Sequence, residues 1–172
     1  MNTLAHTATD GEWPTADFAV GVRVAQPADR EFVMSLVSRL VALGLPAWRD
    51  QRRMLAAGID LISNALVGHR SDAIVMITES QGGERLGFVH IHAATDCHTH
   101  ERHAHVAQML VVDGPQELAA GRALIAAAEE WARSRGYRVL TLDEFWPNRQ
   151  ARGLCKQLGF DEESVKYRKA VR

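Results

Sequence analysis

Apolar residues follow two different spacings along this chain, and the spacings divide it into helices and strands. Consecutive or alternating apolar and β-branched residues are typical of strands, whereas apolar residues at every third or fourth position are typical of amphipathic helices. The first pattern predicts six strands, at Val20–Val24, Ala73–Thr78, Leu86–Ala93, His105–Val112, Val139–Phe145 and Val165–Ala170. The second predicts four helices, with apolar faces that begin near Phe32, Met54, Gly121 and Asn148 and end before Gly44, Gly68, Gly136 and Gly159.

The order of these elements predicts one α/β domain of the mixed, α+β kind. The second and third strands flank the sequence Gln81-Gly82-Gly83-Glu84, which is typical of a hairpin turn. No repeat and no linker interrupts the chain after its first residues. We therefore expect a single domain over residues 18–172, preceded by a loosely ordered tail over residues 1–17.

Composition narrows the classes of protein to which the chain can belong. Its 172 residues, 47% apolar and 24% charged, suffice for one hydrophobic core. A formal net charge of -1 gives no reason to expect a nucleic-acid or membrane partner. The two cysteines form no paired framework, no apolar run approaches the roughly 20 residues that span a bilayer, and the start does not look like a signal peptide. We expect a cytoplasmic protein.

Two segments near the C-terminus carry the strongest chemical signal. In the first, the apolar run Met109–Val112 leads into the small-residue segment Gln116–Leu124, the layout of a strand, a turn and a helix. Small side chains let the backbone approach an anion, which the free N–H groups and the dipole of a helix N-terminus attract. The second segment, Pro147–Phe160, is typical of an N-capped short helix that ends in glycine.

Together the two segments resemble the acetyl-CoA site of the GCN5-related N-acetyltransferase (GNAT) superfamily. Gln116, Ala119 and Gly121 stand where the family has Arg/Gln-x-x-Gly-x-Gly/Ala. The second family motif is matched in order by Asn148, Ala151, Leu154, Cys155, Gly159 and Phe160. The resemblance implies a GNAT fold, in which a central mixed, mostly antiparallel sheet of six to seven strands is flanked by four helices.

The resemblance also implies acetyl-CoA as co-substrate and a place for each of its parts. Its pantetheine arm would lie on the backbone of Met109, Leu110 and Val111. Its pyrophosphate would lie on the turn formed by Gln116, Glu117, Leu118, Ala119, Ala120, Gly121 and Arg122. The resemblance implies that Asn148 hydrogen-bonds to the cofactor arm. Its other open role is to cap its helix, because an asparagine after proline is a favoured N-cap.

Six histidines between residues 90 and 105 supply candidates for the catalytic base. Histidine titrates near neutral pH and so suits removal of a proton from an ammonium group. His92 would come close to His105 if their strands form a hairpin. The segment His103-Ala104-His105-Val106 is similar to the corresponding strand of arylalkylamine N-acetyltransferases, where histidine is the base. We therefore expect His105, and after it His103, in this role.

Other readings of the histidines stay open. His98 and His100 are typical of a solvated hairpin loop, and with Cys97 they also offer nitrogen and sulfur ligands for a transition metal. Their spacing matches no zinc module, and we predict no metal.

Cys155 stands where the family often has the tyrosine that protonates the departing thiolate. A thiol could donate that proton, since its ordinary pKa of about 8.5 lies below the phenol's value of about 10. Alternatively, Cys155 only packs on the helix face that it shares with Ala151 and Leu158.

The resemblance predicts transfer of acetyl from acetyl-CoA to a primary amine of a small molecule, by direct attack in a ternary complex. Trp48 and the neighbouring Arg49, Arg52 and Arg53 lie where GNAT proteins build the acceptor pocket. One alternative is a CoA-binding regulatory or interaction domain that has lost catalysis, and a weaker one is a metal-binding protein. A homodimer is compatible with either enzyme or binding domain.

Overall fold

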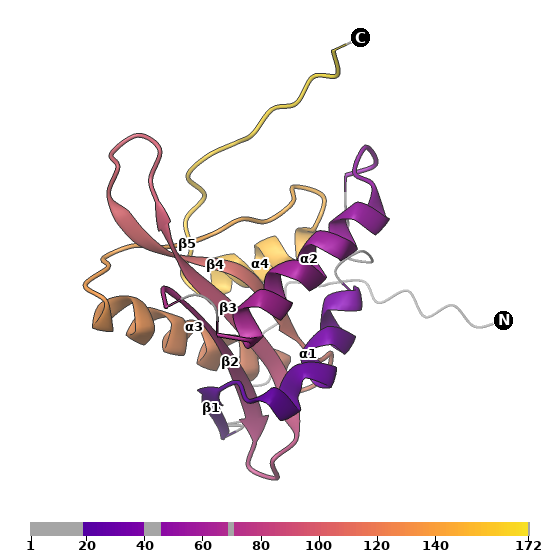
Figure 1. Ribbon diagram of the computed structural model, residues 1–172, viewed down its shortest axis with the longest axis vertical. Coiled ribbons are helices and arrows are strands. Elements are labelled where there is room, and N and C mark those ends of the chain that lie inside the picture. Colours follow the sequence, from indigo (N-terminus) through magenta and orange to yellow (C-terminus); the bar gives the residue numbers. More distant parts are fainter. Residues whose placement is uncertain (1–18, 40–45, 69–70, 172) are drawn as a thin grey trace, which may run out of the picture.

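A five-stranded sheet forms the centre of the computed structural model, which describes residues 19–39, 46–68 and 71–171 (Figure 1). The strands lie side by side in chain order, β1 to β5. Neighbouring strands are antiparallel except for β4 and β5, which are parallel. Their bounds are Val20–Val24, Ala73–Ser80, Arg85–Thr95, Arg102–Val111 and Leu140–Leu142. The predicted mixed, mostly antiparallel sheet is confirmed.

Helices cover both faces of this sheet. The short 3-10 helix η1 (Pro27–Asp29) leads into α1 (Arg30–Val37), and α1 packs with α2 (Gln51–Leu66) on one face. On the other face lies α3 (Glu117–Ser134), and α4 (Arg149–Gln157) follows β5 (Figure 1). Among the described residues, no helix is long and apolar enough to cross a membrane.

Side chains that alternate along the strands contribute to two hydrophobic cores, one on each face of the sheet. On β3, Val89 and Ile91 pack toward α3, whereas Phe88 packs toward α1 and α2. Because successive side chains of a strand point to opposite faces, His90 and His92 also lie on the α1/α2 face. The same rule places His105 there, since its neighbours Ala104 and Val106 belong to the α3 core.

Both hairpins agree with the sequence pattern. The turn between β2 and β3 contains Gly83 with a φ of 79°, a left-handed conformation that favours glycine. In the hairpin of β3 and β4, His92 lies opposite His105. Helix ends agree as well, because Gly68 and Gly136, both with positive φ, follow α2 and α3.

Three expectations about the strands are wrong. The segment Val165–Ala170 forms no strand; it runs away from the sheet (Figure 1), and the side chain of Tyr167 is 92% exposed. The predicted strand Val139–Phe145 shortens to the three residues of β5. The described sheet therefore has five strands and not six or seven. A β-pattern supplies propensity, but a strand also needs a partner within hydrogen-bonding distance.

The predicted tail over residues 1–17 lies outside the described residues. The sequence predicts that the first helix ends before Gly44, which also lies outside them, but α1 already ends at Val37.

A buried carboxylate joins the first strand to the rest of the fold. Asp29 is fully buried, and both its oxygens accept hydrogen bonds from Arg23, at 2.6 and 2.9 Å. Arg85 of β3 lies 2.8 Å away, and the backbone N–H of Gln26 donates at 2.7 Å. Hydrogen bonding by Arg23 lowers the pKa of Asp29 from 3.8 to about 2.

Candidate active site

The parallel strands β4 and β5 separate after only three paired positions. The pairs are Ala104 with Leu140, His105 with Thr141, and Val106 with Leu142. At the same level, the register between β3 and β4 shifts, so that Ala107 is an extra residue in β4. Such a bulge bends a strand. Beyond it, residues 108–111 of β4 have no strand partner on the β5 side in the described part of the chain.

This separation exposes the backbone predicted to hold the pantetheine arm. Met109, Leu110 and Val111 pair with β3 along one edge of β4. Along their other edge, no strand pairs with them in the described part of the chain. Backbone N–H and C=O groups there can pair with an extended chain, as they would with a further strand.

His105 lies at the point where the two strands separate. Its Nδ1 is 2.8 Å from the hydroxyl oxygen of Thr141 on β5. Its ring centroid lies 5.3 Å from that of His92. Burial lowers the pKa of His105 below its ordinary 6.5, an effect that Asp143 opposes and His103 reinforces. The imidazole is therefore neutral at physiological pH and able to accept a proton.

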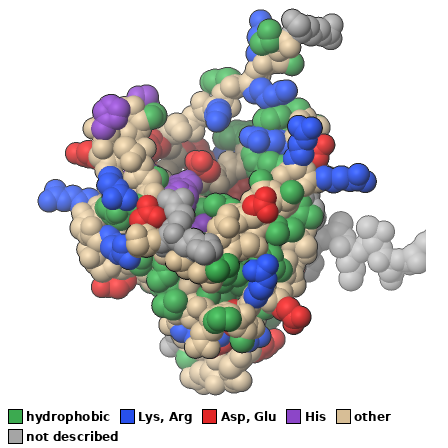
Figure 2. Space-filling view, viewed as in Figure 1, with side chains coloured by type: hydrophobic (Ala, Val, Ile, Leu, Met, Phe, Trp, Pro, Cys, Tyr) green, Lys and Arg blue, Asp and Glu red, His purple; other side chains and the backbone are tan. Residues whose placement is uncertain are grey.

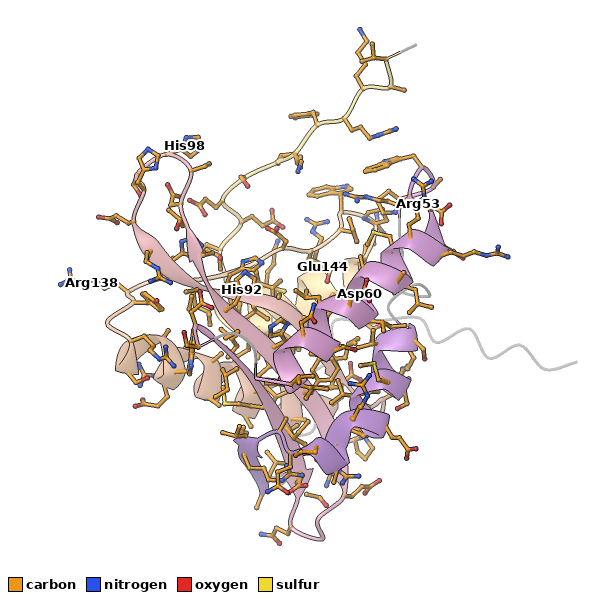
Figure 3. The ribbon with its side chains drawn as sticks, viewed as in Figure 1. Arg53, Asp60, His92, His98, Arg138 and Glu144 are labelled. Carbon is orange, nitrogen blue, oxygen red and sulfur yellow. The ribbon has the colours of Figure 1, made fainter. Side chains whose placement is uncertain are left out.

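The bulge also brings Gln108 onto the face that carries His105. Its amide nitrogen donates to the carbonyl oxygen of Gly58 on α2, at 3.4 Å. Its amide oxygen is buried and has no hydrogen-bond partner among the described residues. Figure 3 labels His92 on the sheet and Asp60 on α2, and by strand alternation with Phe88 the His92 side chain lies on the sheet face that α1 and α2 cover.

The remaining histidines divide between the site and the loop. His103 is half-buried two residues before His105 and, by strand alternation, shares its face. His98 and His100 are exposed in the loop between β3 and β4, as expected for a solvated turn. In Figure 2, histidine side chains appear at the tip of this hairpin and again where the surface is hollowed between the hairpin and the helices. Among the described residues, no three His, Cys, Asp or Glu side chains are placed to hold a metal ion.

The N-terminus of α3 has the features of an anion cradle. The N–H groups of Glu117 and Ala120 donate to Gly114 and Gln116, at 3.1 and 2.8 Å. The N–H groups of Leu118 and Ala119 have no acceptor in the described part of the chain. They remain available for a phosphate.

Two residues of this turn, Gly121 and Glu117, have surroundings that a small-residue phosphate loop would not predict. Gly121 is buried, and a Cβ there would lie 3.9 Å from Leu154 of α4, an ordinary van der Waals contact, so only a side chain larger than alanine would press on α4. The Glu117 carboxylate sits beside the cradle and accepts from Gln150 at 3.5 Å. Burial, followed by the nearby Asp113, raises the pKa of this carboxylate. Arg122 is exposed.

Asn148 and Cys155 lie on α4. The Asn148 side chain accepts from the N–H of Ala151 at 3.3 Å, so its predicted capping role is confirmed. Cys155 is half-buried, and burial together with the negative charge of Glu144 raises its pKa. The thiol therefore stays protonated near neutral pH, which is compatible both with packing and with proton donation.

Sequence reasoning missed Glu144, Gln108 and Thr141. The carboxyl group of Glu144 accepts from the N–H of Phe145 at 2.7 Å. It is solvent-accessible, yet desolvation by its surroundings raises its pKa. Glu144 lies two positions after β5, inside the longer strand that the sequence predicts, so its position gave no signal. Thr141 and Gln108 gave none either, because only the strand register places them on the face of His105.

Arginine and aromatic side chains gather at the predicted acceptor pocket. The Arg49 guanidinium lies 4.5 Å from the centre of the Trp48 ring and 5.5 Å from that of Phe145. Arg168 of the C-terminal segment lies 4.3 Å from the Trp48 ring. The structure thus joins the segment before α2, the segment after β5 and the C-terminal segment.

Comparisons with known proteins agree on one family. The acetyltransferase (GNAT) family model matches residues 43–160. The chain is 29% identical over 93 residues to the uncharacterized N-acetyltransferase YhfO of Bacillus subtilis, a match that covers 54% of this chain and 62% of that protein.

Solved structures share the fold at lower identity. One is AAC(6')-Iy in complex with a CoA-containing bisubstrate analogue, with a TM-score of 0.64, 20% identity, and coverage of 89% of this chain and 99% of that one. Another is the aminoglycoside 6'-N-acetyltransferase AAC(6')-Ih of Acinetobacter baumannii, with a TM-score of 0.63, 11% identity, and coverage of 90% and 100%.

Proposed function

The chain belongs to the acetyltransferase (GNAT) family, an acyltransferase family, and on that premise we propose that it transfers acetyl from acetyl-CoA to a primary amine of a small molecule. One observation carries the proposal. The strands β4 and β5 separate directly beside His105, and the same strand β4 leads to the N-terminus of α3. A base, a free strand edge and an anion cradle thus follow one another along one strand and the turn after it.

The residues present fit acetyl-CoA. The free edge of Met109, Leu110 and Val111 can pair with the amides of a pantetheine arm, and the N–H groups of Leu118 and Ala119 can bind the pyrophosphate. Acetyl-CoA would supply an activated acetyl thioester. Asn148 uses its side-chain oxygen to cap α4, and its side chain also hydrogen-bonds to Glu144, so its amide nitrogen would donate to a ligand only by giving up that contact.

His105 is the proposed base. Its lowered pKa keeps it neutral, so that it can take the proton from the acceptor ammonium and leave a nucleophilic amine for direct attack. His103, on the same face, is the second choice. The amine must approach from the α2 side, because that is the face on which His105 lies.

The proton for the departing thiolate has two candidate donors on this chain. Cys155 and Glu144 both have raised pKa values and lie close enough for the charge of one to affect the other. The Cys155 thiol, whose ordinary pKa already lies above neutral, holds its proton at neutral pH. For Glu144, the raised pKa favours the protonated form. Packing alone stays a role for Cys155.

The acceptor is proposed to be a small molecule, since the similar structures include aminoglycoside acetyltransferases. The Trp48, Arg49 and Phe145 cluster would form one wall of the acceptor pocket. Its positive charge favours an amine that also carries an anionic group over a polycation.

A binding and turnover experiment tests the proposal. Thermal unfolding is followed with acetyl-CoA, CoA or zinc, and acetylation is then screened over amines that include an aminoglycoside, amino acids and polyamines. We expect stabilisation by both CoA compounds, none by zinc, and acetyl transfer to at least one amine. Absence of CoA stabilisation would overturn the proposal.

The second candidate function is a CoA-binding domain without efficient catalysis. The observation that favours it is Cys155 at the place of the family's frequent tyrosine. Stabilisation by CoA without acetylation of any amine, together with turnover gained in Cys155→Tyr, would support this candidate.

A further inference from the structure

The hydroxyl group of Thr141 contacts two acceptor-capable groups at the level of the proposed base. Its oxygen lies 2.8 Å from Nδ1 of His105 and 3.5 Å from the carbonyl oxygen of Ala104. Thr141 faces His105 because the two residues are partners in the short parallel ladder of β4 and β5.

Two proton arrangements fit the contact with His105, since the tautomer of the ring decides which of the two atoms donates. Only one of them also keeps the contact with Ala104, long at 3.5 Å, because a carbonyl oxygen can only accept and so uses the single hydroxyl proton of Thr141. The hydroxyl oxygen is then left as an acceptor toward His105. For a neutral imidazole, the Nδ1 atom must carry the ring proton, and Nε2 keeps its lone pair.

The opposite nitrogen is suitably placed to use that lone pair. In the described part of the chain, Nε2 of His105 has no hydrogen-bond partner, and it is not among the polar atoms sealed from solvent. A second conformation, in which Thr141 donates to Nδ1, would place a proton on Nε2 and remove the free base. It would also forfeit the contact with Ala104.

We propose that Thr141 is a positioning residue that holds His105 in the Nδ1–H tautomer, with the Nε2 lone pair directed at the acceptor amine. This inference rests on the proposed function, in which His105 is the base. As a positioning residue, Thr141 acts through the imidazole. On this proposal, His105 can act as a base only because the register of β4 and β5 places Thr141 beside its ring.

The test compares three variants. Thr141→Val keeps the branched shape and removes the hydroxyl, whereas Thr141→Ser keeps the hydroxyl. The matched control is Thr78→Val on β2, where a fully buried hydroxyl has no partner within the described residues. Thermal unfolding first establishes that each variant is folded.

The primary readout is the ¹⁵N NMR spectrum of the His105 ring, assigned by its loss in His105→Ala and recorded at a pH where the ring is neutral. Wild type, Thr141→Ser and Thr78→Val should show a protonated Nδ1 and an unprotonated Nε2. Thr141→Val should show a mixture of tautomers. A wild-type ring protonated at Nε2, or a Thr141→Val spectrum identical to wild type, would overturn the inference.

Kinetics provide the second readout. Thr141→Val should lower kcat about tenfold, at the lower end of the range of activity losses seen when a hydrogen-bond partner that orients a histidine is removed. The KM for acetyl-CoA should not change. Thr141→Ser should restore kcat, and Thr78→Val should not change it. Because the NMR readout needs no turnover, a wrong tautomer in an active enzyme refutes the role of Thr141 alone, whereas an inactive protein refutes the proposed function.

Discussion

The imidazole of His105 combines partial burial with an accessible ring nitrogen. It is half-buried, which lowers its pKa, yet one ring nitrogen stays accessible. A base of lowered pKa remains unprotonated in weak acid, but it accepts a proton less strongly. Asp143 partly offsets this loss by stabilising the protonated ring.

His105→Ala should lower kcat about 100-fold, the scale for removal of a general base. Acetyl-CoA should bind as before, because the proposed cofactor contacts begin at Met109. The fall of kcat/KM on the acidic side, expected below pH 6.5 in the wild type, should flatten. Steady-state kinetics over a pH series measure these changes. His98→Ala, which removes an exposed histidine of the hairpin loop, is the control, and equal rates for the two variants would shift the role to His103 or to water.

Cys155 permits a separate test of proton donation. If the thiol only packs, Cys155→Ala should cost about 1 kcal/mol of stability and little turnover, and Cys155→Tyr should be neutral or faster. If the thiol is the acid, Cys155→Ala should lower kcat by about 100-fold or more, and Cys155→Tyr should preserve it. We expect the packing outcome, because Cys155 lies on the helix face that it shares with Ala151 and Leu158. Single-turnover rates and urea unfolding distinguish the two results.

At the scale of the element, α3 serves the fold and the proposed site through different residues. Its middle packs on the sheet, whereas its first turn offers free N–H groups. Gly121, for all its resemblance to a phosphate-loop glycine, contacts α4. A bulky residue at Gly121 would therefore disturb packing as well as anion binding and could not separate the two.

Ala119→Glu is the sharper probe of the cradle. It places a negative charge beside the free N–H groups and should abolish stabilisation by acetyl-CoA, since like charges repel where the pyrophosphate would lie. Ala126→Glu is the matched control, because it makes the same change two turns later at an exposed position of the same helix. Thermal-shift titration with acetyl-CoA compares them. Similar affinities in both folded variants would remove α3 from the proposed cofactor site.

At the scale of the whole molecule, the Asp29 cluster fastens the edge strand β1 to the sheet. The carboxylate joins Arg23 on β1 to Arg85 on β3, and Arg23 reaches Glu79 on β2 at 2.6 Å. Removing Asp29 would leave two guanidinium groups beside a buried site without their shared partner.

Asp29→Ala should lower the free energy of unfolding by about 3 kcal/mol, within the range for breaking a buried ion pair. The pKa of Asp29 is lower in the folded state, about 2, than its ordinary 3.8. Its stabilising contribution is therefore complete above pH 3.8 and is lost as the pH falls through 2. Urea unfolding at pH 7 and pH 3 measures both effects. Glu130→Ala, which removes an exposed partner of Arg133, should cost under about 1 kcal/mol, and an equal cost for the two variants would contradict this role of Asp29.

The sequence by itself determined the helices, both hairpins and the family. Those features depend on short-range chemistry, namely the spacing of apolar residues, the glycines Gly68, Gly83 and Gly136 at helix ends and turns, and the capping by Asn148. Each is encoded within a few positions of the residue concerned. The alternation of β3 likewise determined that His90 and His92 share a face.

Only the tertiary structure decided what lies beside those residues. The extra residue Ala107 brings Gln108 to the face of His105, and the parallel pairing of β5 brings Thr141 to its ring. The same long-range geometry left Val165–Ala170 without a partner despite its β-pattern. Local spacing encodes the face on which a side chain lies, whereas its neighbour across the sheet depends on register between segments about 36 positions apart, as for His105 and Thr141.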